Sequence, residues 1–217
     1  MDTRIIQGND RRAIPAALSV LRSGGLVAFP TDTVYGLGAL AIHAHAVERI
    51  YIVKGRPRVK AIPILVGELD DLQEVSAGRN DLAMKLAACF WPGALTLVVA
   101  RHPDLPAQVS DSGTVGVRMP DHALARALLR AAGPMAVTSA NLSDRGNTTS
   151  AADVSGQLGG LIELIVDGGT APGGIPSTVV NCLGGEPVVL RQGPISHDDL
   201  VAALITGEVT GRPAGKD

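Results

Sequence analysis

Apolar residues recur along the chain with two spacings, which predict two kinds of secondary structure. Steps of three or four residues mark one face of an amphipathic helix, as with Leu82, Leu86 and Phe90. Asn9 or Asp10 is a suitable cap for the first such helix. This spacing predicts helices over about residues 10–23, 45–53, 82–90, 124–131 and 197–205, and one that begins at Ser150.

Short continuous apolar runs, bounded by glycine, proline or polar residues, predict buried strands. These runs lie at residues 26–30, 62–66, 95–100, 114–119, 135–138, 161–166, 178–182 and 187–191. The alternation of helices and strands is typical of one α/β domain with a large, twisted, mixed sheet flanked by helices. We assign this domain to residues 1–206 and expect the Gly- and Pro-containing segment 207–217 to be a disordered tail.

Composition narrows the functional classes. Apolar residues make up 46% of the 217 positions and aromatic residues only 2%, so the core is aliphatic and a nucleic-acid surface of stacked aromatics is not expected. The net charge of −2 gives no general attraction to nucleic acid. No apolar run approaches a membrane span. Two distant cysteines, Cys89 and Cys182, favour a reduced cytoplasm, and five histidines show no metal-ligand spacing.

One short stretch carries four cations at alternate positions, and we call residues 54–60 the basic segment. Its cations are Lys54, Arg56, Arg58 and Lys60. Pro57 bars a continuing helix, and in an extended chain the four side chains would share one face. Arginine forks and lysine ammonium groups suit the oxygens of a polyphosphate. A solvated basic loop is the alternative explanation of the same pattern.

Polar segments follow directly on several predicted strands. They are residues 31–33 (Thr-Asp-Thr), 139–141 (Ser-Ala-Asn) and 167–169 (Asp-Gly-Gly). Ligands gather beyond strand ends of this kind in open α/β sheets, although the same residue types also serve ordinary turns. Residues 36–41 match G-x-G-x-x-A, but a polar loop separates these glycines from the preceding strand, and no acidic residue follows at the distance a dinucleotide site needs. A Walker motif and a G-x-S-x-G nucleophile elbow are both absent from the sequence.

Six motifs in order resemble the YrdC-like threonylcarbamoyl-AMP synthases. They lie at residues 30–38 (PTDTVYGLG), 54–57 (KGRP), 91–96 (WPGALT), 117–120 (VRMP), 139–141 (SAN) and 177–179 (STV). The resemblance runs from about residue 10 to residue 205 and implies the YrdC-like fold. The family's Lys-x-Arg and Ser-x-Asn pairs, its catalytic tetrad, are complete as Lys54, Arg56, Ser139 and Asn141.

The resemblance implies an enzyme that joins L-threonine, bicarbonate and ATP into threonylcarbamoyl-AMP and releases pyrophosphate. The residues that it places on ATP are Lys54, Arg56, Arg58, Ser139, Asn141 and Arg191, with Thr114 and Asn147 as further nucleotide contacts. Asn147 stands where relatives often have serine. Threonine is assigned to Thr31, Arg118 and Ser177, with Arg118 near the carboxylate. Mg²⁺ would arrive with ATP, held mainly by the phosphates.

The implied partners are proteins that pass the threonylcarbamoyl group to an adenosine beside the tRNA anticodon, and direct RNA or tRNA binding is a further expectation. Some relatives carry a second C-terminal domain that closes over the site, and we expect none here. Two alternatives stay open at this point. The chain could be a non-catalytic RNA- or nucleotide-binding member of the same fold, or a nicotinamide oxidoreductase built on the glycines of residues 36–41.

Overall fold

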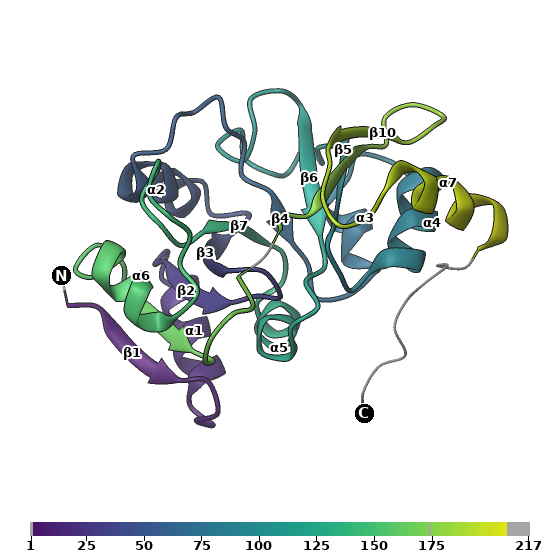
Figure 1. The fold of residues 1–217 in the computed structure, drawn as a ribbon. Helices are drawn as coiled ribbons and strands as arrows, with labels where there is room; N and C mark the ends of the chain where they lie inside the picture. The colour runs from purple at the N-terminus through teal and green to yellow at the C-terminus, as the bar shows by residue number, and fades with distance from the viewer. Residues whose placement is uncertain (1, 174, 208–217) are drawn as a thin grey trace.

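Within residues 2–173 and 175–207, which the computed structural model describes, the chain forms one ten-stranded mixed sheet (Figure 1). The strands follow the spatial order β1-β8-β2-β3-β7-β4-β6-β5-β9-β10. Their bounds are β1 Arg4–Gln7, β2 Val27–Pro30, β3 Tyr35–Leu40, β4 Ile64–Leu65, β5 Leu95–Ala100, β6 Thr114–Arg118, β7 Met135–Ser139, β8 Leu164–Asp167, β9 Thr178–Asn181 and β10 Val188–Arg191. The predicted α/β class with a large mixed sheet is confirmed.

The sheet contains both antiparallel and parallel pairs of strands. Three pairs of strands that are consecutive in the sequence are antiparallel, namely β2 with β3, β5 with β6, and β9 with β10. Parallel pairs form where a longer crossover intervenes, as in β4 with β6 and β5 with β9. Antiparallel pairs also join strands that are far apart in the sequence, as in β3 with β7 and β4 with β7, and the sheet is mixed.

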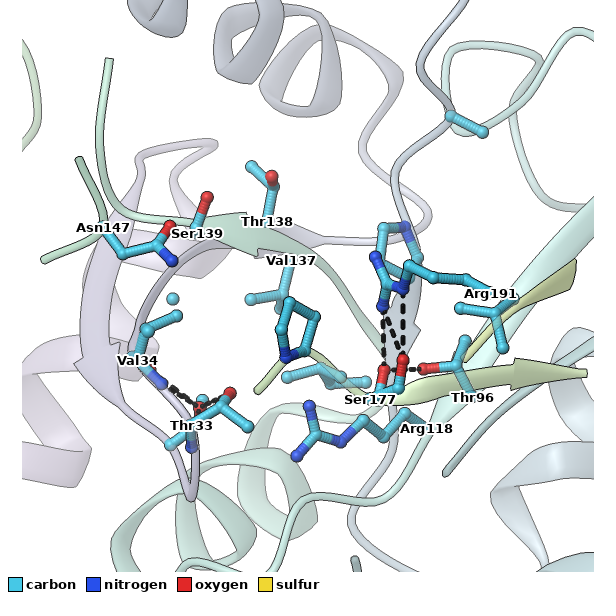
Figure 2. A pocket seen from close by; sticks show the side chains of 18 of the residues that line it. Thr33, Val34, Thr96, Arg118, Val137, Thr138, Ser139, Asn147, Ser177 and Arg191 are labelled. Carbon is cyan, nitrogen blue, oxygen red and sulfur yellow. Dashed lines mark hydrogen bonds between the residues drawn. The ribbon is translucent and has the colours of Figure 1, made fainter. Parts of the chain in front are cut away.

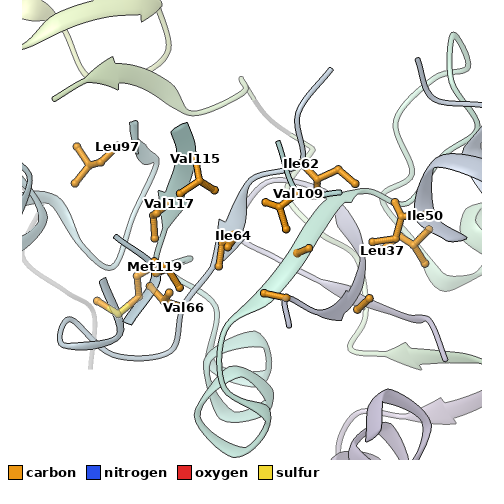
Figure 3. Packing of buried hydrophobic residues seen from close by; sticks show 14 of the residues in the cluster. Leu37, Ile50, Ile62, Ile64, Val66, Leu97, Val109, Val115, Val117 and Met119 are labelled. Atoms are coloured by element: carbon orange, nitrogen blue, oxygen red, sulfur yellow. The ribbon is translucent and has the colours of Figure 1, made fainter. Parts of the chain in front are cut away.

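Helices cover both faces of this sheet (Figure 1). Their bounds are α1 Ala13–Arg22, α2 Ala44–Lys54, α3 Asp71–Val75, α4 Asp81–Phe90, α5 Ala123–Ala132, α6 Ala151–Leu158 and α7 His197–Thr206. One buried cluster joins α1 and α5 to β2, β7 and β8 and includes Leu21, Phe29 and Leu128. The larger cluster lies on the other face, where Leu37, Ile64 and Leu97 pack with residues from the remaining helices; Figure 3 shows part of it.

Most of the elements predicted from hydrophobic spacing are present, with a few differences. Strands β1 and β3 and the short helix α3 were not predicted, because β1 is largely exposed and β3 contains two glycines. The first helix begins at Ala13, and neither Asn9 nor Asp10 caps it; the Asp10 carboxylate instead accepts from the Arg12 N–H at 2.8 Å. The Gly36–Ala41 motif lies along β3 and its end, not in a strand-to-helix turn. Apart from Gly207, the predicted tail lies outside the described residues.

A buried threonine fastens the last strands to the chain that leads into α7. Thr178 has no exposed surface, and its hydroxyl donates to the Ile195 carbonyl at 2.8 Å. The same oxygen accepts from the N–H groups of Gly193 at 3.1 Å and Ile195 at 3.0 Å. One side chain thereby pairs with three backbone groups. The Ile195 carbonyl also accepts from Gln192 Nε2 at 2.9 Å, so the N–H groups of Gly193 and Ile195 are the two that depend on Thr178.

We expect Thr178→Val to lower the free energy of unfolding by about 2–3 kcal/mol. Valine keeps the shape of threonine but leaves the partly buried N–H groups of Gly193 and Ile195 without their acceptor, and each such group costs about 1–3 kcal/mol. Urea unfolding followed by circular dichroism measures the change. Thr170→Val, on an exposed residue, is the matched control. Equal stability of both variants would show that the three hydrogen bonds do not hold this segment.

Candidate functional site

A cavity of about 480 Å³ lies on the face of the sheet that α1 and α5 also cover (Figure 2). Its floor comes from strands β3, β7, β4, β6, β5 and β9. Leu65 and Val137 show the shared face, because both belong to the α1–α5 cluster and both line the cavity. A volume of this size is in the range of small-molecule sites.

Strand register brings distant residues together on this floor. Gly36 lies opposite Ser139, Leu65 opposite Arg118, and Thr96 opposite Val179. Gly116 leaves room between them, because a Cβ atom built there would lie 3.0 Å from the Thr96 methyl carbon. The cavity therefore depends on residues that alternate along each strand, which the linear sequence does not place side by side.

Arg118 forms one charged wall of the cavity. The residue is only 8% exposed, and its Nε–H donates to the Gly93 carbonyl at 3.0 Å. Its Nη2 donates to the Asp32 carboxylate at 2.6 Å. A guanidinium that is held in this way keeps a fixed direction, which suits recognition of a carboxylate.

Ser177 and Arg191 stand next to this wall. The Ser177 hydroxyl shares a hydrogen bond of 2.7 Å with the Thr96 hydroxyl, and Figure 2 shows Arg191 reaching over both. Arg191 Nη2 donates to the Ser177 carbonyl at 2.8 Å and to its hydroxyl at 3.2 Å. Burial, and next the charge of Arg118, lowers the pKa of the Arg191 guanidinium. Two cations facing one cavity are suited to an anionic ligand.

The turn between β2 and β3 supplies the opposite wall. The Thr31 hydroxyl donates to the Val34 carbonyl at 2.7 Å and lies 3.1 Å from the Thr33 hydroxyl. Both threonines line the cavity. Hydroxyl groups that are fixed in this way offer hydrogen bonds to a polar ligand without adding charge.

Tyr35 connects three loops at this end of the site. Its N–H donates to the Thr148 carbonyl at 2.9 Å, and its carbonyl accepts from the Ala140 N–H at 2.8 Å. Its hydroxyl donates to the Gly169 carbonyl at 2.6 Å and accepts from the Gly168 N–H at 3.2 Å. Burial, reinforced by the Asp167 carboxylate, raises the pKa of this phenol to about 12. Tyr35 therefore stays protonated and holds these loops together.

The basic segment does not form the one-faced row of cations that its spacing predicts. Gly55 takes a left-handed conformation at the end of α2, and residues 57–60 form a turn in which the Lys60 N–H donates to the Pro57 carbonyl at 3.0 Å. Arg56 lines the cavity and donates to the carbonyls of Lys60 and Ala61, at 2.9 and 2.8 Å. The expectation of an extended segment is wrong, because Gly55 changes the direction of the chain two residues before Pro57 and a turn follows from Pro57 to Lys60.

Arg58 points away from the cavity. Its guanidinium forms an ion pair with Glu48 on α2 and lies 4.9 Å from the centre of the Tyr51 ring. Arg58 is not among the residues that line the cavity. Of the four cations in the basic segment, only Arg56 is a lining residue.

Lys54 is buried beneath the site, with 3% of its surface exposed. Its ammonium donates to the Ser139 carbonyl at 2.5 Å and to the Asn141 carbonyl, and its own carbonyl accepts from the Ser143 N–H at 2.8 Å. Burial, and next the charge of Arg56, lowers the pKa of Lys54 to about 8. The side chain thus fixes the loop that carries Ser139 and does not line the cavity itself.

The other predicted residues also divide into those that line the cavity and those that do not. Asn141 Nδ2 donates to the carbonyls of Leu142 and Arg145, both at 2.8 Å, and shapes the loop from within. Thr114 hydrogen-bonds Ser112 at 2.8 Å beyond the cavity. The predicted residues that do line the cavity are Thr31, Arg56, Arg118, Ser139, Asn147, Ser177 and Arg191.

The sequence analysis assigned no ligand to the remaining wall residues, among them Thr33, Thr96 and Val179, although these three lie in the polar segment 31–33 or in the motifs 91–96 and 177–179. Alternation along the predicted strands was a signal for Thr96 and Val179, but only the register shows which strands are neighbours. No Asp or Glu is among the lining residues, and the described part of the chain has no cluster of three or more metal-binding side chains. None of the helices within it is long and apolar enough to span a membrane.

Comparisons of the sequence with known proteins identify its family. The sequence model of the Sua5/YciO/YrdC family, described as telomere recombination, matches residues 19–193. A threonylcarbamoyl-AMP synthase of Bacillus subtilis is 42% identical over 88% of this chain and 56% of its own length. A putative threonylcarbamoyl-AMP synthase of Mycobacterium tuberculosis is 40% identical over 89% of both chains.

Solved structures with a similar fold belong to the same family. The Sua5 protein of Pyrococcus abyssi, crystallised with L-threonine, superposes with a TM-score of 0.86 at 38% identity, covering 98% of this chain and 63% of that one. YciO of Escherichia coli gives a TM-score of 0.78 at 28% identity, over 88% of this chain and 96% of that one. The chain thus spans only part of its longer relatives and nearly all of the shorter ones. By sequence and fold it belongs to the Sua5/YciO/YrdC family.

Proposed function

We propose that the chain is a threonylcarbamoyl-AMP synthase, a nucleotidyltransferase that converts L-threonine, bicarbonate and ATP into threonylcarbamoyl-AMP and pyrophosphate. The observation that carries the proposal is the make-up of one cavity: Arg118, Ser177 and Thr31 line it together with Arg56 and Ser139. The cavity thereby combines an arginine guanidinium that can bind a carboxylate with hydroxyl groups that can bind a polar side chain. The same cavity also holds groups that are suited to phosphate. The names of the curated relatives support the same activity.

The amino acid would bind between Arg118 and the hydroxyl-bearing residues. The guanidinium of Arg118 matches a carboxylate in two-point geometry, and burial strengthens such a contact. The Thr31 and Ser177 hydroxyl groups are the candidates for reading the threonine hydroxyl, since each lies in an ordered hydrogen-bonded pair. The bound L-threonine of the Pyrococcus protein supports a threonine site in this fold.

The nucleotide would bind toward Arg56, Ser139 and Asn147, and Arg191 lines the same cavity beside Ser177. Threonine and bicarbonate condense to a carbamate with loss of water. A carbamate oxygen then attacks the α-phosphorus of ATP, the bond to the bridging oxygen breaks, and pyrophosphate leaves with the bonding electrons. Such a transfer needs alignment and neutralisation of charge, not a covalent nucleophile. Arg56 and Arg191 are placed to supply positive charge.

Mg²⁺ would accompany ATP through the phosphates. The lining residues supply hydroxyl, amide and guanidinium groups but no carboxylate, so the cavity walls offer the ion no strong ligand. When bound, the ion would neutralise phosphate charge. The residues of this chain would then act by orienting the two substrates.

The product would be consumed by a transferase that modifies the adenosine beside the tRNA anticodon, and the expected setting is the cytoplasm. Of the rival functions, RNA binding loses its main support, because the basic segment is folded into a turn and Arg58 is paired with Glu48. The nicotinamide alternative requires a glycine turn before a helix, but Gly36 and Gly38 are buried within β3.

The first test is pyrophosphate release with each substrate omitted in turn. We expect release to require bicarbonate and to follow threonine over serine over valine. Serine lacks one methyl group, which is worth about 1–3 kcal/mol, while valine leaves buried polar groups unpaired. Arg118→Ala should raise the KM for threonine more than the KM for ATP. Release that ignores threonine, or that runs equally well with valine, would contradict the proposed function.

A second prediction separates the two arginines of the basic segment. Arg56→Ala and Arg56→Lys should each raise the KM for ATP by about tenfold or more, because the fork that holds two carbonyls beside the cavity is lost. Arg58→Ala is the matched control and should change the KM for ATP by less than about threefold, since exposed ion pairs contribute little. An equal rise in the KM for ATP in Arg56→Ala and Arg58→Ala would show that the overall positive charge matters and the direction of each guanidinium does not.

A third prediction follows from the pKa of Lys54. Between about pH 8 and the unfolded value near 10.5, the unfolded chain binds this proton and the folded chain does not. Unfolding therefore takes up a proton, and the free energy of unfolding should rise with pH by up to about 1.4 kcal/mol per unit relative to Lys54→Met. Urea unfolding across this range measures it, with exposed Lys85→Met as the control. If the free energy of unfolding varied with pH in the same way in the native protein and in Lys54→Met, the lowered pKa of Lys54 would be contradicted.

A further inference from the structure

Asp32 and Arg118 form the least exposed ion pair in the described part of the chain. Their side chains are 16% and 10% exposed, and Oδ2 of Asp32 lies 2.6 Å from Nη2 of Arg118. Asp32 itself is not among the residues that line the cavity, whereas its neighbours Thr31 and Thr33 are. The carboxylate therefore lies behind the cavity wall and contacts the guanidinium from that side.

The two hydrogen bonds of Arg118 use one edge of its guanidinium. Nε donates to the Gly93 carbonyl and Nη2 to Asp32, and these nitrogens share an edge. Of the five N–H groups of an arginine, this leaves both on Nη1 and the second on Nη2. Within the described residues no acceptor is bonded to Nη1. The end of the fork thus remains available for two-point contact with a carboxylate.

The turn that carries Asp32 is itself held in place. The Thr33 N–H donates to the Thr31 hydroxyl at 3.2 Å, and the Gly173 N–H donates to the Thr33 carbonyl at 2.9 Å. The second oxygen of Asp32, Oδ1, is buried without a partner among the described residues. A carboxylate in this position is unfavourable on its own, so its pairing with Arg118 has to offset the loss of water.

We propose that Asp32 is a positioning residue, which aims the free edge of Arg118 at the carboxylate of the amino-acid substrate. It also lessens repulsion between Arg118 and the nearby cation Arg191, which would otherwise push the two guanidinium groups apart when the cavity is empty. The inference rests on the proposed function, because it assigns the Arg118 fork to an amino acid.

The contact between Asp32 and Arg118 could also hinder the substrate, and this role predicts the opposite change in the KM for threonine when Asp32 is removed. If the Asp32 carboxylate only occupies the place of the substrate carboxylate, the substrate has to displace it. Its removal would then lower the KM for threonine. If Asp32 aims the fork, its removal allows Arg118 to turn, and the KM for threonine rises.

The experiment measures pyrophosphate release by the full chain and by its Asp32→Ala and Asp32→Asn variants. We expect Asp32→Ala to raise the KM for threonine by about tenfold or more, the scale of one hydrogen bond to a charged group, with less than about threefold change in the KM for ATP. Asp32→Asn keeps one acceptor for Nη2 but loses the charge, so its rise should be smaller. Glu68→Gln, in the exposed pair with Arg130, is the control and should match the native protein.

A double-mutant cycle shows whether the effect acts through Arg118. Asp32→Ala added to Arg118→Ala should not raise the KM for threonine further, whereas independent effects would add. A lower or unchanged KM for threonine in Asp32→Ala, or equal rises for threonine and ATP, would overturn the inference. Thermal melting identifies a variant that has not folded, and Asp32→Asn then supplies the comparison. A native protein that releases no pyrophosphate with threonine would instead contradict the proposed function itself.

Discussion

Side chains alternate between the two faces of a strand, and the site depends on how that alternation is aligned across neighbouring strands. Gly36 meets Ser139 and Leu65 meets Arg118 because the register pairs them. A shift of one residue in either pair would turn every side chain of that strand to the other face. The large aliphatic core on the far face fixes the register, so hydrophobic packing remote from the cavity determines which polar groups line it.

Around this floor, the cations have separate tasks. Gly55 reverses the chain at the end of α2, so Lys54 enters the interior while Arg56 reaches the cavity. A buried ammonium needs acceptors, and the Ser139 and Asn141 carbonyls supply them. The loop that carries Ser139 is therefore shaped by a charge that does not line the cavity. The arrangement explains how a lysine and an arginine only two positions apart, Lys54 and Arg56, can serve the same site differently.

Local signals in the sequence were sufficient for much of this structure. Hydrophobic spacing predicts most helices and strands, and the helix expected to begin at Ser150 is α6, where Ser150 and Asp153 form a capping box. The motif resemblance names seven residues that line the cavity. It does not distinguish them from Lys54 and Asn141, which lie behind the wall, because that distinction depends on three-dimensional contacts. The extended form expected for the basic segment failed for a similar reason, since Pro57 restricts its neighbour but Gly55 decides the direction of the chain.

Tyr35 joins the loops at residues 140, 148 and 168–169 through backbone and hydroxyl hydrogen bonds. Because one residue takes part in all of these bonds, a fluctuation that detaches one loop also weakens the attachment of the others. This edge of the site is therefore expected to open as one cooperative unit, with a single free energy of opening. Entry and exit of a ligand along this edge would then have a rate that is set by that shared event and not by the mobility of any single loop.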